Sequence, residues 1–132
     1  MIKGVFLRRR NRFVIECDVK GRTAPAHLPN PGRLWELLLP GREILLRRNA
    51  ADSGRSTPYT AMAVMRDGRP VLLHTQMTND VAERLLRERR IPGLEDTQIV
   101  RREATFGNSR FDFLLRRGSE EIILEVKSCT LF

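Results

Sequence analysis

Two carboxylates and an ammonium near the C-terminal end of the sequence have the types and spacing of a metal-dependent hydrolytic site. Asp112 lies in the apolar stretch 110–116, and Glu125 and Lys127 lie in the stretch 120–127. Carboxylate oxygens are the ligands that Mg²⁺ and similar hard cations prefer. An ammonium two residues after the second carboxylate can orient an attacking water or stabilise the charge of a phosphoryl transition state. These three residues predict phosphodiester hydrolysis with Mg²⁺ or Mn²⁺.

The turn between the two stretches places the carboxylates opposite each other. Residues 118–119 are Gly-Ser, a two-residue loop whose Gly-first order favours a type II′ hairpin. In the register that this loop sets, Asp112 falls opposite Glu125. Arg110 falls opposite Lys127 by the same count, and all four side chains share one face. Opposed carboxylates have Cβ atoms about 4.5 to 5.5 Å apart and repel each other, so Asp112 and Glu125 are predicted metal ligands.

The other face of this hairpin is apolar and predicts a core. In the simpler alternative, the charged face is the water side of an antiparallel sheet and carries only diagonal salt bridges. The apolar positions are Phe111, Phe113 and Leu115 on the first strand and Ile122, Leu124 and Val126 on the second.

A third metal ligand could come from one of three further carboxylates. Glu103 stands at the end of the stretch before the hairpin and is the first candidate. Glu83 and Glu88 are its rivals, since some nucleases draw a carboxylate from a preceding helix. Each of the three can also be an ordinary surface charge. His27 and His74 lack metal-ligand spacing to any Cys or His, and we interpret both as structural or binding residues.

One helix and three strands must position these groups. Asn79 or Asp80 predicts the start of a helix that runs to about residue 90, since Asp80 and Glu83 have capping-box spacing. Pro92-Gly93 then ends it. Strand-like segments follow at residues 98–104, 110–116 and 120–127.

The first half of the chain predicts a small β-barrel. Short strands separated by Gly, Pro and Asn turns, with one brief helical or turn segment, are typical of an OB-like barrel, although an SH3-like barrel would give nearly the same pattern. We place the domain boundary so that residues 1–75 form the barrel and residues 76–132 the second domain. The predicted strands are residues 5–7, 13–19, 23–28, 43–48, 59–65 and 71–74, and the brief segment is residues 33–39.

The charge of the chain is concentrated in the barrel. The 132 residues hold 24 Lys and Arg against 16 Asp and Glu, and the entire surplus of +8 lies in residues 1–75. Arginine provides 21 of the cations, which favours a partner whose anions are gripped bidentately, such as phosphate. With 41% hydrophobic residues the chain is not a disordered polycation. Cations interspersed with aromatic rings predict nucleic-acid contact through Arg8, Arg9, Arg10, Arg12 and Trp35.

Several classes of protein are excluded by what the sequence lacks. Cys17 and Cys129 are far apart and form no CxxC motif, so neither a disulfide framework nor a thiolate zinc site is indicated. No apolar stretch approaches the ~20 residues of a membrane-spanning helix, and no secretory signal follows Met1. We expect a soluble cytoplasmic protein without a membrane partner.

Seven stretches, in order and spanning nearly the whole chain, resemble the sugar fermentation stimulation protein A family. The PNPG turn and the SRFDFLL and EVKSCTL segments are together quite specific to it. The matching stretches are residues 12–13, 26–32, 38–41, 57–60, Asn79, 109–115 and 124–131.

The resemblance implies a mostly β, α+β protein. Its expected parts are an N-terminal OB-like barrel and a domain similar to the PD-(D/E)xK restriction-endonuclease-like fold, with DNA binding and nuclease activity. Asp112 stands at the acidic position of the family, and Glu125 and Lys127 stand at its ExK motif. The expected partner is DNA, either single-stranded or non-specific duplex, with RNA less favoured. A non-catalytic, DNA-binding or regulatory role in sugar metabolism is the alternative.

Members of this family continue well past the ExK strand, whereas this sequence stops at Phe132. Only the αβββ part of the nuclease-like domain is therefore expected. We expect exposed apolar surface, partial disorder or association between copies beyond the barrel, and binding rather than turnover by this chain alone.

Overall fold

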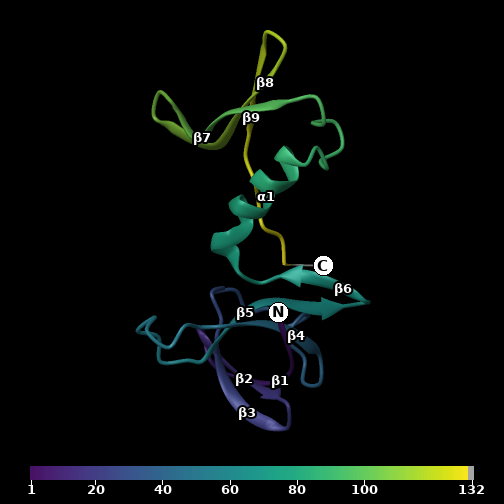
Figure 1. Cartoon of the computed structure of the whole chain (residues 1–132), viewed down its shortest axis with the longest axis vertical. Coiled ribbons are helices and arrows are strands. Elements are labelled where there is room, and N and C mark those ends of the chain that lie inside the picture. Colours follow the sequence, from purple (N-terminus) through teal and green to yellow (C-terminus); the bar gives the residue numbers. More distant parts are fainter. Residues whose placement is uncertain (131–132) are drawn as a thin grey trace. The chain divides into compact units, whose positions relative to one another are not determined.

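The computed structural model describes residues 1–130 and divides the chain into two compact units (Figure 1). Unit 1 is Met1–Gln76, joined by residues 129–130, and unit 2 is Met77–Ser128. Leu131, with which the last matching stretch ends, lies outside the described residues.

Unit 1 is a closed five-stranded barrel with a short hairpin extension. Its strands follow the order β3-β2-β1-β4-β5-β6, and a parallel pairing of β3 with β5 closes the ring. This closure confirms the predicted OB-like barrel. The strands are β1 (Ile2–Asn11), β2 (Val14–Val19), β3 (Arg22–His27), β4 (Glu43–Arg48), β5 (Tyr59–Arg66) and β6 (Arg69–Leu72).

Strand β1 is longer than its sequence predicts. It spans Ile2–Asn11 because it pairs with β4 at one end and with β2 at the other. The expected strand at residues 5–7 was too short, since three consecutive arginines hide the alternation of apolar and polar positions that marks a strand.

The segment 33–39 forms hydrogen-bonded turns, as expected. The amides of Leu37 and Leu38 both donate to the carbonyl of Leu34, at 3.1 and 2.9 Å. All three leucine side chains are buried in the barrel core. Trp35, between them in sequence, is 72% exposed.

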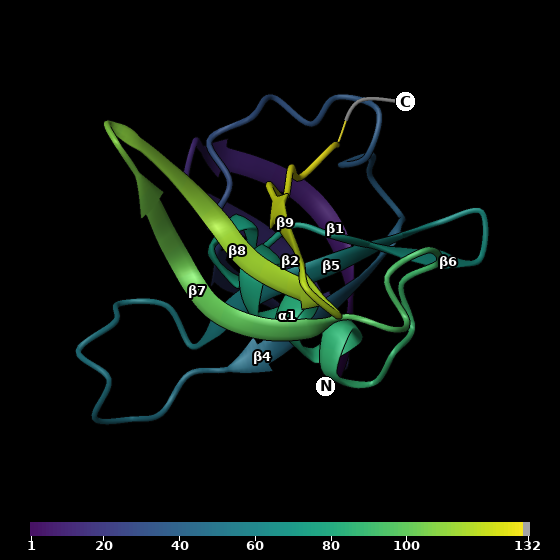
Figure 2. The same cartoon turned by 90° about the horizontal axis from the view of Figure 1, so that it is seen from above.

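Unit 2 packs one helix on a three-stranded antiparallel sheet. The sheet order is β7-β8-β9, and Figure 2 shows β7 and β8 as a long curved hairpin. The core of the unit contains Phe113 and Leu115 from the predicted apolar face, with Ala82 and Leu86 from the helix. The elements are η1 (Thr75–Met77), α1 (Thr78–Arg87), β7 (Gln98–Phe106), β8 (Ser109–Arg117) and β9 (Glu120–Leu124).

The predicted cap of α1 is wrong. The helix begins at Thr78, and its N-cap residue Met77 makes no side-chain capping bond. Asn79 donates to Asp112 instead, and Asp80 accepts from Arg102. Both polar side chains therefore form hydrogen bonds to residues of the sheet and do not cap the helix.

The predicted apolar face of the hairpin is largely covered: Phe113 and Leu115 are fully buried, and Ile122 and Leu124 pack beside them partly buried. Exposed apolar side chains lie elsewhere, at Val81 on α1 and at Ile123, which is on the opposite face of β9. An open hollow of about 370 Å³ lies between the helix and the chain around Leu124 and Val126. Among the described residues, no helix has the length and apolar character needed to cross a membrane.

Candidate metal centre and nucleic-acid interface

The β8–β9 hairpin has the predicted register but ends earlier than predicted. Five pairs run from Arg117–Glu120 to Phe113–Leu124. Gly118 has φ 59° and Ser119 has no positive φ, as a type II′ loop requires. The regular pairing stops at Leu124, one step before Asp112 would pair with Glu125.

Asp112 does not pair with Glu125 in the ladder, and its carboxylate accepts two hydrogen bonds instead. Its Oδ2 accepts the backbone N–H of Val126 at 2.7 Å, and its Oδ1 accepts Nδ2 of Asn79 at 2.9 Å. The bond from Val126, supported by the one from Asn79, lowers the pKa of Asp112. Asp112 is therefore ionised at neutral pH, held in one orientation, and left with lone pairs for further ligands.

Glu125 and Lys127 flank the residue that Asp112 contacts. Both are exposed, and Lys127 Nζ lies 2.7 Å from Oε1 of Glu125. This contact raises the pKa of Lys127. The structure thus brings both predicted residues to the chain segment that Asp112 binds, with Lys127 paired to Glu125.

The candidates for a third carboxylate ligand all have other partners. Glu103 bonds Arg110 at 2.6 Å. Glu83 pairs with Arg87 and Arg102, and Glu88 pairs with Arg84 and Arg90. Within residues 1–130, no group of three or more His, Cys, Asp or Glu side chains is arranged to hold a metal ion.

Asp112 and Glu125 are the two carboxylates that could hold a hard divalent cation in this part of unit 2. Asn79 turns its Nδ2 towards Asp112 and so orients that carboxylate rather than offering an oxygen to it. Mg²⁺ is usually held by one or two carboxylates and keeps several waters. Sequence reasoning noticed Asn79 only as the start of a helix, because its bond to Asp112 joins residues 33 positions apart.

In the barrel, two of the predicted nucleic-acid contacts pair with a buried acid. Arg8 and Arg10 both bind the carboxylate of Glu16, Arg10 at 2.6 Å. Hydrogen bonds from Arg8 and then Arg10 lower the pKa of Glu16 to about 2. The two guanidiniums and one carboxylate form a cluster that retains a single positive charge.

Arg9 has a structural role that the sequence does not reveal. Its guanidinium donates to four backbone carbonyls, those of Arg12, Asn30, Gly32 and Arg33, at 2.6 to 3.1 Å. It therefore ties β1 to the turn that follows β3.

The same turn is held from within by Asn30. This buried side chain accepts the N–H of Gly32 at 2.9 Å and donates to the carbonyl of Leu73 at 3.2 Å. A Cβ on Gly32 would lie 3.0 Å from Oδ1 of Asn30, so this position favours glycine. The PNPG motif could have signalled a tight turn, but not these partners.

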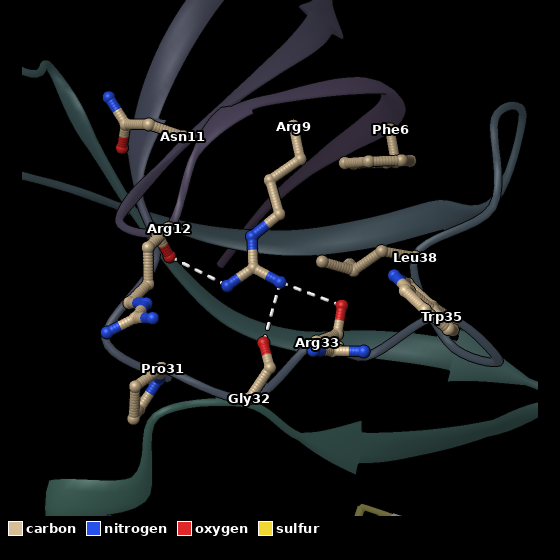
Figure 3. Close-up of a pocket in the computed structure, with 9 residues that line it drawn as sticks. All are labelled: Phe6, Arg9, Asn11, Arg12, Pro31, Gly32, Arg33, Trp35 and Leu38. Carbon is tan, nitrogen blue, oxygen red and sulfur yellow. Dashed lines mark hydrogen bonds between the residues drawn. The ribbon is translucent and has the colours of Figure 1, made fainter.

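A pocket of about 400 Å³ opens beside this turn. Figure 3 shows the Arg9 guanidinium between Arg12 and Trp35. The Arg33 guanidinium carbon lies 5.1 Å from the centroid of the Trp35 ring, a cation–π distance. Within the described residues, the Arg12 side chain forms no ion pair with a carboxylate. The lining residues are Phe6, Arg9, Asn11, Arg12, Pro31, Gly32, Arg33, Trp35 and Leu38.

Both units match described domains of known proteins. Residues 7–73 match the SfsA N-terminal OB domain, and residues 76–132 match the sugar fermentation stimulation protein RE domain. A structure of Pyrococcus furiosus SfsA in complex with Ca²⁺ superimposes with a TM-score of 0.71 at 32% identity, over 96% of this chain and 53% of that one.

Curated relatives share this similarity along nearly the whole chain. The sugar fermentation stimulation protein homolog of Methanothermobacter thermautotrophicus is 38% identical over 98% of this chain and 54% of its own length. The homolog of Shouchella clausii is 40% identical over 99% of this chain and 57% of its own length. The chain thus spans about half the length of these relatives.

Proposed function

Because the chain belongs to the sugar fermentation stimulation protein family, we propose that it binds DNA through unit 1 and carries a metal-dependent phosphodiesterase site in unit 2. The observation that carries this proposal is that the positive charge and the anchored carboxylate lie in different units. The surplus of positive charge lies in the OB barrel, and the anchored carboxylate Asp112 lies in unit 2.

The barrel supports nucleic-acid binding by its fold and its charge. OB folds commonly bind single strands through a cationic groove with aromatic side chains. Exposed Trp35 and Arg12, which has no carboxylate partner within residues 1–130, lie on one pocket of this barrel. Arginine gives bidentate contacts to phosphate, which favours DNA or, second, RNA over other anions.

The metal site is supported by the chemistry of its donors. The relative from Pyrococcus furiosus is described in complex with Ca²⁺, a cation that also takes oxygen ligands. In this chain Asp112 and Glu125 would hold Mg²⁺ or Mn²⁺, which supplies Lewis-acid activation of a phosphodiester when bound. Val126 and Asn79 fix the orientation of Asp112. The Lys127 ammonium would leave Glu125 to stabilise charge on the substrate phosphate.

Calorimetric titration with Mn²⁺ tests the metal site directly. We expect uptake by the parent chain and a loss of at least about tenfold in affinity for Asp112→Asn, since removal of a charged ligand weakens a hard-cation site. Asp96→Asn is the matched control, because Asp96 pairs with Arg117 in the same unit and has no proposed metal role. Equal uptake by parent and Asp112→Asn would refute the site.

Cleavage assays with Mn²⁺ test the proposed chemistry. We expect hydrolysis of single- or double-stranded DNA to be abolished by Asp112→Ala and strongly reduced by Lys127→Ala. The assay is run on this chain and on a relative of full family length. Cleavage that is unchanged in both variants would contradict the assignment.

Non-catalytic DNA binding is the second candidate function. It is favoured by the ion pairs of Glu83, Glu88 and Glu103. Among the candidate carboxylates in the described part of the chain, these pairs leave Asp112 and Glu125 for a metal. DNA binding without cleavage by either the chain or the longer relative would support this function over the first.

A further inference from the structure

We propose that the pocket beside Trp35 is a subsite for one unpaired nucleobase, with an adjacent phosphate bound by Arg12. This inference rests on the proposed nucleic-acid binding and specifies which form of nucleic acid the barrel prefers. All residues that line the pocket belong to unit 1.

The first argument is the exposure of Trp35. Its neighbours Leu34, Leu37 and Leu38 are buried in the barrel core, yet the indole itself is 72% exposed. Burial of large apolar rings is strongly favourable. An indole that a well-anchored segment holds in solvent is therefore available to a ligand with its own flat ring.

The second argument is that the pocket is preorganised. Arg9 binds four carbonyls around the pocket wall, and Figure 3 shows its bonds to those of Arg12, Gly32 and Arg33. Asn30 holds the adjacent turn. A ligand that enters such a site orders little protein backbone, which lowers the cost of binding. Pockets of this size accept small organic ligands.

The third argument is charge. Arg33 lies against the Trp35 ring, so a base would stack on the indole face that Arg33 leaves uncovered. Arg12 borders the same pocket and, among residues 1–130, has no carboxylate partner. With Trp35 to stack on a base and Arg12 to bind the next phosphate, the pocket matches the alternation of base and phosphate along a single strand.

Only an unpaired base fits this description. In a duplex each base is stacked on its neighbours and paired, and removing it from the stack costs free energy. We therefore expect single strands, frayed ends or bubbles to bind more tightly than blunt duplex.

Trp35 is the one tryptophan of the chain, so tryptophan fluorescence reports on the surroundings of this one side chain. We expect a short oligothymidine to quench that fluorescence and an abasic oligomer of equal length and charge to leave it almost unchanged. The two ligands differ only in their bases.

Binding of the same two labelled oligomers, followed by anisotropy, gives the second readout. Trp35→Ala should weaken oligothymidine binding about 5- to 100-fold and leave abasic binding unchanged, and Trp35→Phe should retain part of the affinity. Leu39→Ala is the control, since Leu39 is an exposed apolar residue of the same segment and does not line the pocket.

The outcomes separate this inference from the proposed function. Undiminished oligothymidine binding by Trp35→Ala, or an equal loss for both oligomers, would overturn the base subsite while nucleic-acid binding stands. Failure of the parent chain to bind either oligomer would overturn both.

Discussion

At the scale of single residues, neighbouring arginines in one strand have different roles. Arg8 and Arg10 point to one side of β1 and bind Glu16, whereas Arg9 points to the other side and binds carbonyls. This alternation is the ordinary consequence of a strand, in which successive side chains face opposite ways. Arg12 follows β1 in the turn and keeps its charge available.

The Glu16 cluster makes the stability of unit 1 depend on pH. Glu16 has a pKa of about 2 in the fold and about 4.3 in an unfolded chain. Its stabilisation is present in full above the unfolded value and is lost as pH falls towards the folded value. We therefore expect Glu16→Gln to lower the free energy of unfolding at about pH 7 and to match the parent near about pH 2.

Urea denaturation followed by far-UV circular dichroism measures this difference, because the cluster joins β1 and β2 of the barrel. Glu43→Gln, which removes the exposed pair with Lys3, serves as the control and should change little at either pH. A difference between parent and Glu16→Gln that is the same at both pH values would contradict the prediction.

At the scale of elements, the start of α1 is tied to the sheet rather than capped. Asn79 and Asp80 would satisfy the helix in isolation, but they bind Asp112 on β8 and Arg102 on β7. The end of β9 shows the same competition. Asp112 takes the Val126 N–H, so the chain after Leu124 leaves the ladder.

The loop between β8 and β9 sets the register on which the site depends. Gly118 has φ 59°, a conformation that costs other residues about 1 to 2 kcal/mol. We expect Gly118→Ala to destabilise the hairpin by about that amount. Faster hydrogen exchange of the β8 and β9 amides would show it.

Ser119→Ala is the matched control for this loop, because Ser119 has no positive φ. It should leave exchange in β8 and β9 almost unchanged. Equal exchange rates in Gly118→Ala and the parent would show that the register does not depend on the glycine.

At the scale of the whole molecule, the surplus positive charge and the proposed metal site lie in different units. The net charge of +8 resides in unit 1, while unit 2 has as many acids as cations. Three of the barrel's guanidiniums are already engaged within the protein. Arg8 and Arg10 bind Glu16, and Arg9 binds backbone carbonyls. Fewer guanidiniums are therefore free to contact phosphate directly than the number of arginines suggests, although the net charge of the unit is unchanged.

DNA affinity should fall steeply with salt, because each phosphate contact releases counterions. We expect Arg12→Glu to weaken binding and to reduce the slope of log K against log salt by about 1. Arg116→Glu, an exposed residue of unit 2, should leave the slope unchanged. An affinity that does not vary with salt would contradict phosphate contact altogether.

Local patterns in the sequence predicted a small β-barrel, the apolar face of the hairpin and its register, and the family resemblance favoured the OB-like barrel over an SH3-like one. Turn chemistry and the alternation of strands depend on residues close together in the chain, and the structure confirms these features. The same patterns selected Asp112, Glu125 and Lys127, whose proposed roles await the metal titration. They could not show that three carboxylates outside this group are already paired.

The tertiary structure alone decided which partners each polar side chain binds. Arg9 meets carbonyls as many as 24 positions away, and Asn79 meets Asp112 across 33 positions. No periodicity encodes such contacts, because they exist only once strands and turns have been brought together. Residue types and short-range order determined the barrel and the hairpin, and the packing of distant segments determined which cations remain available and which carboxylate is held in place.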